Sequence, residues 1–194
     1  MVINIPSQVN RAIEILLGKG YSAFVVGGAV RDAVMGITAN DWDIATSALP
    51  DETVNTFEGF RTVKTGIKHG TVTVIIDSMN IEITTFRIEN GYSDNRHPDR
   101  VDFTNHIEDD LSRRDFTVNA IAYSPQKGFV DPFGGLEDIN SSVIRCVGEP
   151  DKRFGEDALR ILRALRFSAV LGFEIDPETA ESIHKNYYLL KNIS

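Results

Sequence analysis

The sequence predicts an α/β domain with a mixed sheet over residues 1–150, followed by an all-helical segment over residues 151–194. Apolar residues at helical spacing alternate with short β-branched runs up to about Gly148, and from Phe154 onwards the spacing is purely helical. The chain has 194 residues, 42% of them hydrophobic and 25% charged, which is ordinary globular usage. That length suits one full domain and the beginning of a second.

The first elements follow from apolar spacing and glycine positions. Residues 8–17 have a helical pattern, which Gly18 and Gly20 end. Residues 22–26 then form a short buried strand, and a helix over residues 29–35 begins directly after the pair Gly27 and Gly28.

Later elements are marked by turn residues. Residues 71–77 and 81–87 are rich in β-branched side chains and predict an antiparallel hairpin whose turn is 78–80. Residues 90–100 form a polar loop that we expect to be hard to order. Ser112 with Asp115 resembles a capping box and predicts a helix over 112–123, and residues 131–135 form a turn.

Charge and cysteine usage limit the function classes. The net charge is −8, with 21 acids and 13 bases in residues 1–150 and seven of each in residues 151–194. Binding of nucleic acid by this chain alone is disfavoured, because phosphates need concentrated Lys and Arg. Cys146 is the only cysteine, so no disulfide framework or thiolate cluster is expected. The first 20 residues lack a signal or membrane stretch, which favours a cytoplasmic protein without membrane contact.

The glycine pair Gly27 and Gly28 is the first candidate binding feature. A glycine turn between a strand and a helix lets the backbone approach a phosphate, and Arg31 could clamp the same group bidentately. The alternative is a purely structural turn. A dinucleotide-binding oxidoreductase fits poorly, because the G-x-G-x-x-G spacing is absent.

Three carboxylates form the second candidate feature. Asp41 and Asp43 are two residues apart, so on a strand they share one face while Trp42 points away. Adjacent carboxylates repel, and a divalent cation such as Mg²⁺ between them would relieve this. A solvated turn is the alternative. Glu82, on the predicted hairpin, is a candidate third acid that positions metal or accepts a proton.

The C-terminal helical pattern separates polar from apolar residues. At 100° per residue, one side carries Glu156, Asp157, Arg160, Arg163 and Ala164, and the other carries Ala158, Ile161, Leu162 and Leu165. One side would pack and the other would contact a ligand. The alternative is a solvated face with the ion pairs Asp157–Arg160 and Glu156–Arg160.

Seven motifs between residues 20 and 173 resemble the class II tRNA nucleotidyltransferases, which include CCA-adding enzymes and bacterial poly(A) polymerases: GGAVRD, DWDIAT, KHGTVTV, EITTFR, EDDLSRRDFTVNA, DPFGG and GEDALRILRALRF. The resemblance implies a head of the DNA polymerase beta nucleotidyltransferase type over residues 1–150. A partial helical neck follows over 151–194. Body and tail domains that grip tRNA are not expected within the 194 residues.

The same resemblance assigns roles to individual residues. Gly27, Gly28 and Arg31 would bind the triphosphate, Asp41 and Asp43 would ligate Mg²⁺, and Arg114 would contact the nucleotide. Asp157 and Arg160 would pair with the edge of the incoming base, whose polarity suits C or A rather than G or U. Arg163 and Arg166 would extend the site towards the phosphates or the primer. Asp110, Arg113 and Asp115 would support Arg114, and Asp115 could reach a ribose hydroxyl.

The function implied is template-independent addition of CMP and AMP from CTP and ATP to the 3′ end of tRNA by a two-metal mechanism. A-only addition and poly(A) addition share these motifs and stay open, whereas CC-only addition is disfavoured by the intact 88–100 loop. A nucleotide-binding regulatory module without turnover is the alternative from another class. We expect weak tRNA binding by this chain, and the sequence leaves the oligomeric state open.

Overall fold

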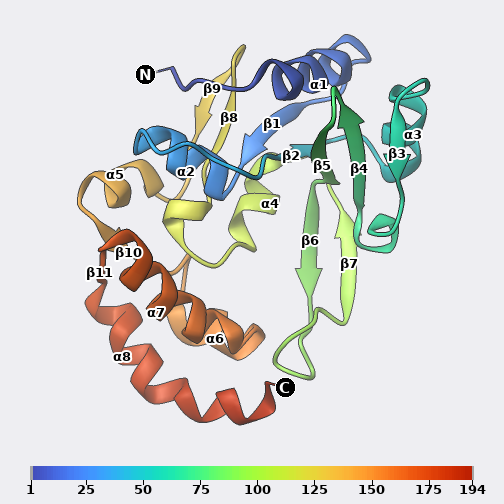
Figure 1. Cartoon of the computed structure of the whole chain (residues 1–194). Helices are drawn as coiled ribbons and strands as arrows, with labels where there is room; N and C mark the ends of the chain where they lie inside the picture. The colour runs from blue at the N-terminus through green and yellow to red at the C-terminus, as the bar shows by residue number, and fades with distance from the viewer. Residues whose placement is uncertain (1, 194) are drawn as a thin grey trace.

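The computed structural model describes residues 2–193, and its centre is one seven-stranded mixed sheet (Figure 1). The strand order is β3-β4-β5-β2-β1-β8-β9, and of the neighbouring pairs only β2 with β5 is parallel. The strands are β1 (Ala23–Val26), β2 (Asp43–Thr46), β3 (Arg61–Val63), β4 (Thr71–Ile76), β5 (Met79–Thr85), β8 (Ala122–Ser124) and β9 (Gly128–Val130). The predicted α/β class with a mixed sheet is confirmed.

Both faces of the sheet centre are buried, which explains why residues 23–26 are continuously apolar. Val25 packs into the larger core with helix α1, and Phe24 and Val26 pack into a second core with Leu111 of α4. The helices of this part are α1 (Ser7–Gly18), α2 (Gly28–Val34), α3 (Pro50–Thr56), α4 (Ile107–Ser112) and α5 (Gly135–Asn140). The predicted helix over residues 8–17 is therefore confirmed as α1.

The predicted hairpin is confirmed as β4 and β5, but its turn is shifted. Asp77 and Ser78 occupy the turn with φ of 47° and 69°, and Met79 already pairs with Ile76 in the ladder. Positive φ at both central residues gives the twist that a two-residue hairpin loop needs. Asn80, expected in the turn, belongs to β5.

Residues 87–103 form a two-stranded arm, made of β6 (Arg87–Asn90) and β7 (Arg100–Phe103). Residues 91–99 between the two strands form a loop, as predicted. The expectation that this loop is hard to order is wrong, because its tip is held by the C-terminal segment. The Asn95 side chain donates to the carbonyl of Gly155 (2.7 Å), and the amide of Ala158 donates to the carbonyl of Asn95 (3.0 Å).

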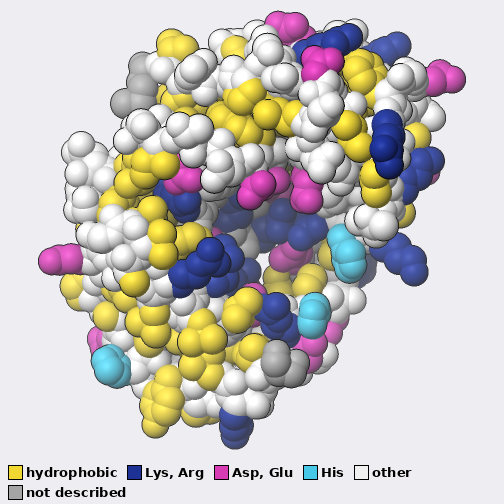
Figure 2. All heavy atoms as spheres, in the orientation of Figure 1, with side chains coloured by type: hydrophobic (Ala, Val, Ile, Leu, Met, Phe, Trp, Pro, Cys, Tyr) yellow, Lys and Arg dark blue, Asp and Glu magenta, His cyan; other side chains and the backbone are white. Residues whose placement is uncertain are grey.

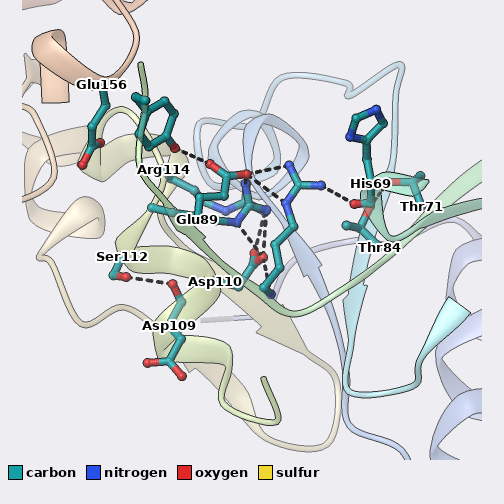
Figure 3. Close-up of polar contacts among 12 residues, drawn as sticks. His69, Thr71, Thr84, Glu89, Asp109, Asp110, Ser112, Arg114 and Glu156 are labelled. Carbon is teal, nitrogen blue, oxygen red and sulfur yellow. Dashed lines mark hydrogen bonds and ion pairs between the residues drawn. The ribbon is translucent and has the colours of Figure 1, made fainter. Parts of the chain in front are cut away.

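The predicted helix over residues 112–123 is wrong. Ser112 is the last residue of α4, and its hydroxyl donates to the carbonyl of Asp109 (2.7 Å; Figure 3). Only a 3₁₀ turn, η2 (Thr117–Asn119), precedes β8. Phe116 and Val118 belong to one core and Ala120 to the other, so the segment is buried on two sides instead of along one helical stripe.

The C-terminal segment contains α6 (Pro150–Glu156), α7 (Leu159–Leu171), α8 (Pro177–Asn186) and the 3₁₀ helix η3 (Tyr187–Asn192). It is not all-helical, because β11 (Glu174–Ile175) pairs in parallel with β10 (Val143–Ile144). A short strand pair thus joins the two parts of the chain. The division at residue 150 stays a prediction, and α6 begins there. No helix within residues 2–193 has both the length and the apolarity to cross a membrane.

Candidate active site

A cleft of about 510 Å³ lies between the sheet part and α7. Figure 2 shows it as a hollow at the centre of the molecule, with basic side chains inside and acidic ones at its rim. Its lining is mainly charged and comes from both parts of the chain: Gly27, Gly28, Arg31, Asp43, Arg87, Glu89, Tyr92, Arg96, Pro98, Arg113, Arg114, Asp115, Asn119, Asp157, Arg160, Arg163 and Phe167.

The glycine turn brings backbone and two arginines together. Gly27 has φ of 74°, and α2 begins at Gly28, one residue before the predicted start of this helix. A Cβ atom on Gly27 would stand 2.9 Å from Nη1 of Arg114, and one on Gly28 would stand 3.4 Å from Nη2 of Arg31. A side chain at Gly27 would therefore be strained and would displace Arg114.

The carboxylates lie where β2 begins. Strand β2 starts at Asp43, so Asp41 and Trp42 precede it, and Trp42 is buried while both aspartates are exposed. Asp43 stands opposite Glu82 in the parallel pairing of β2 with β5. Desolvation by the surrounding protein, and then the charges of Glu82 and Asp41, raise the pKa of Asp43, although Arg114 lowers it. The fold therefore gathers negative charge at Asp43.

This donor set suits Mg²⁺ held partly by ligand oxygens. Across residues 2–193, no group of three or more His, Cys, Asp or Glu side chains is already arranged as a metal cluster. Mg²⁺ is usually held by one or two carboxylates with water and substrate phosphates, and it does not need a full protein cage. Asp43 and Asp41 are oxygen donors with mutually unfavourable charge, which a cation would offset.

A network of ion pairs holds the Arg114 side chain in place (Figure 3). Asp110 accepts from Arg113 (2.8 Å) and Arg114 (3.3 Å), and Arg113 also pairs with Glu89 (2.9 Å). Burial alone would raise the pKa of Asp110, but the two guanidinium groups hold it below its usual value. Asp115, expected in the same network, instead accepts from Arg163 (2.7 Å).

The helix carrying the C-terminal motif is broken. Asp157 is extended (φ −136°, ψ 103°) between α6 and α7, so it does not share a helix with Arg160. Arg160 pairs with Glu156 (3.0 Å), which confirms one expected ion pair. The other is wrong, because Asp157 accepts from Arg96 (3.3 Å) and from the amide of Leu159 (3.0 Å).

The faces of α7 also differ from the prediction. Ile161 is buried, as expected, but so are Arg160 and Ala164 from the predicted polar side. Leu162 and Leu165 are 45% and 50% exposed. The periodicity assumed one helix through Asp157, and the break before Leu159 changes which residues face the sheet part.

The cleft gathers most of the predicted site residues. Those that line it are Gly27, Gly28, Arg31, Asp43, Arg114, Asp157, Arg160 and Arg163. Asp41 and Glu82 do not line it but lie beside Asp43. Arg166 is exposed on α7 and is not part of the lining.

Sequence reasoning missed several lining residues. Five of them come from the β6–β7 arm: Arg87, Glu89, Tyr92, Arg96 and Pro98. Arg87 ends the predicted strand, and Tyr92, Arg96 and Pro98 lie in the predicted loop, to which no role was assigned. Asn119 and Phe167 also line the cleft. Both lie inside quoted motifs, RRDFTVNA and LRALRF, so the motifs carried a signal that residue chemistry alone did not.

This fold and cleft define the class of nucleotidyltransferase heads. The crystal structure of the Bacillus stearothermophilus CCA-adding enzyme in complex with CTP is similar over 96% of this chain and 45% of that chain, with a TM-score of 0.88 and 45% identity. The model of the poly(A) polymerase head domain matches residues 23–145, and the chain belongs to that family.

Curated relatives agree with this membership. The CCA-adding enzyme of Ligilactobacillus salivarius (strain UCC118) is 45% identical over 197 residues, covering 100% of this chain and 48% of the relative. That of Bacillus subtilis (strain 168) is 48% identical over 182 residues, covering 94% and 45%. A solved tRNA nucleotidyltransferase complexed with a primer tRNA and an incoming ATP analogue is also similar (TM-score 0.75, 30% identity, 92% of this chain and 50% of that chain). The chain spans about half the length of the curated relatives it matches.

Proposed function

We propose that this chain binds CTP and ATP with Mg²⁺ and takes part in adding CMP and AMP to the 3′ end of tRNA. One observation carries the proposal: a single cleft joins Asp43 and the glycine turn to Asp157 and Arg160 of the C-terminal segment. Phosphate-binding and base-recognising groups therefore face the same space. The similar proteins named CCA-adding enzymes, one of them solved with CTP, support this reaction, which we place in the cytoplasm.

The triphosphate would lie along the glycine turn. Gly27 and Gly28 leave room for close backbone approach, and Arg114 and Arg31 stand beside them as guanidinium donors. Guanidinium groups bind phosphate oxygens bidentately, and preorganised donors stabilise charge that develops during transfer. The buried pair with Asp110 fixes the direction of Arg114.

Asp41 and Asp43 would hold Mg²⁺, with Glu82 as the third acid. When bound, the ion would neutralise triphosphate charge and activate the attacking hydroxyl. Glu82 stands opposite Asp43 and accepts the proton of that hydroxyl. Asp43 must be ionised to act, so activity rises with pH as this carboxyl, whose pKa is raised, loses its proton.

Asp157 and Arg160 would recognise the base. A carboxylate acceptor beside a guanidinium donor suits the exocyclic amino group and ring nitrogen of C or A, and it presents the wrong polarity to G and U. Both side chains are oriented by ion pairs, Asp157 with Arg96 and Arg160 with Glu156. Arg163 lines the cleft and would contact the phosphates, and Arg166, outside it, is a candidate contact for the primer.

The test is incorporation of labelled CTP and ATP into a tRNA that lacks its 3′ end, with Mg²⁺ present. Incorporation of both nucleotides in order supports CCA addition, and incorporation of ATP alone would indicate A-adding or poly(A) activity. Binding of both nucleotides without incorporation, by this chain and by a longer chain that includes it, would favour the regulatory module. The Asp43→Asn variant is the control that separates binding from turnover.

A further inference from the structure

Two cleft arginines from distant parts of the sequence contact one aromatic ring. The guanidinium carbon of Arg31, on α2, lies 5.3 Å from the centroid of Phe167, and that of Arg163, on α7, lies 5.0 Å from it. Guanidinium groups at such distances are attracted to the ring face. The ring is itself held edge-on by the fully buried Phe116 at 5.9 Å. A fixed ring therefore sets the positions of both cations.

A polar link joins the same two arginines. Asn119 accepts from Nη1 of Arg31 (2.6 Å), and its amide nitrogen donates to Oδ1 of Asp115 (3.2 Å). Oδ2 of Asp115 then accepts from Nε of Arg163 (2.7 Å). With Phe167, these side chains form a closed circuit of contacts between the sheet part and α7. All of them line the cleft.

This circuit of contacts holds the guanidinium groups of Arg31 and Arg163 close together although both are positively charged. Asp32 neutralises Arg31 (2.7 Å), and Asp115 neutralises Arg163 (2.7 Å). Within the part of the chain that the structure describes, Nη1 of Arg163 has no hydrogen-bond acceptor. Nη1 can therefore donate to an anion in the cleft while Nε and Nη2 of Arg163 stay at Asp115.

We propose that Asn119 and Phe167 are positioning residues that hold Arg31 and Arg163 as one two-armed clamp on the triphosphate; this inference rests on the proposed function. Neither residue needs to touch the nucleotide. Asn119 is suited to its place because an amide both accepts from Arg31 and donates to Asp115. An aspartate there would set two carboxylates against each other.

The test compares affinity for CTP with affinity for CMP, with Mg²⁺ present, in the 194-residue chain. Phe167→Leu keeps apolar bulk but removes the ring face, and Asn119→Asp keeps the acceptor but removes the donor. Phe167→Leu is expected to weaken CTP binding about tenfold, the size of one to two cation–π contacts. Asn119→Asp is expected to weaken it by a similar factor of about tenfold, because it loses the hydrogen bond to Asp115. Both variants should leave CMP binding nearly unchanged. Phe167→Tyr retains the ring and is expected to restore CTP binding to within about twofold of the original.

The outcomes separate this inference from the proposed function. If the unaltered chain binds neither CTP nor ATP, the proposed function fails. If it binds both, but Phe167→Leu and Asn119→Asp leave the ratio of CTP to CMP affinity unchanged, the clamp is wrong. A parallel loss of both ligands with a lowered melting temperature would show a purely structural role and would also overturn it. Should Phe167→Leu fail to fold, Asn119→Asp decides alone, because it replaces a buried, cleft-lining amide by a group of nearly the same size.

Discussion

Asp43 and Glu82 stand directly opposite each other on the parallel strands β2 and β5, and both are exposed on the same face of the sheet. Paired residues of neighbouring strands project to the same face, so the two carboxylates confront each other. The raised pKa of Asp43 reflects desolvation first and this neighbour second. The arrangement costs stability, and a cation bound between the carboxylates would offset that cost.

Asp43→Asn is expected to abolish nucleotide transfer without lowering the stability of the metal-free protein. A carboxyl whose pKa is raised by folding contributes stability below its ordinary value of 3.8, and that contribution is lost as pH rises through the raised value. At pH 7 the variant should therefore melt at the same temperature or roughly 1–2 °C higher. Asp41→Ala is likewise expected to abolish transfer without lowering stability. Transfer near the original rate in either variant would remove these aspartates from the mechanism.

Asp110→Asn is expected to destabilise the protein by about 3–5 kcal/mol, because it removes the buried counter-charge of Arg114 and leaves Arg113 with Glu89 alone. The pKa of Asp110 is lowered by folding, so its contribution is present above pH 3.8 and is lost as pH falls through the lower folded value. Denaturant unfolding at neutral and acidic pH measures this, and the gap between the variant and the original should close in acid. Glu108→Gln, an exposed neighbour on α4, is the matched control and should change little.

Gly27→Ala is expected to weaken CTP binding more than tenfold by displacing Arg114, since its Cβ would stand 2.9 Å from Nη1. Backbone strain alone would cost about 1–2 kcal/mol of stability. Gly36→Ala isolates that strain, because Gly36 has the same φ of 74° but nothing within 4 Å of its added Cβ. Equal loss of CTP affinity in both variants would mean that strain, and not Arg114, explains the effect.

Arg160→Ala is expected to reduce discrimination of CTP and ATP against UTP and GTP by about 1–3 kcal/mol, the value of a bidentate base contact. Incorporation or binding of all four triphosphates measures it. Arg166→Ala on the same helix is the control, because Arg166 is exposed outside the cleft. An equal loss for all four nucleotides would assign Arg160 to the phosphates or to the packing with Glu156 and Arg113.

The 194-residue chain is expected to bind CTP or ATP with Mg²⁺ but to bind tRNA weakly and extend it poorly. Its net charge is −8, and affinity for a polyanion depends on how many phosphates are neutralised. Two titrations at one fixed moderate salt, nucleotide against protein and tRNA against protein, test this. Tight tRNA binding, comparable to that of a longer chain that includes these residues, would contradict the expectation.

The sequence by itself determined the local features of this protein. Gly27 marks the turn between β1 and α2, and the β-branched runs on either side of Asp77 and Ser78 pair as the predicted hairpin. The spacing of Asp41 and Asp43 sets both on one side of the chain. Such features depend on residues near one another in sequence, so periodicity and turn chemistry suffice to find them. The motifs added the family, which single-residue chemistry could not have supplied.

Only the tertiary structure decided which of these features meet. The parallel pairing of β2 with β5 brings Glu82 to Asp43, and the break at Asp157 turns Leu162 and Leu165 outward, which helical spacing did not indicate. The tertiary structure also places the β6–β7 arm so that Arg96 forms an ion pair with Asp157. The contacts of Phe167 with Arg31 and Arg163 join segments far apart in sequence. Long-range pairing depends on the burial of both sheet faces at once, a property of the folded whole that no local spacing encodes.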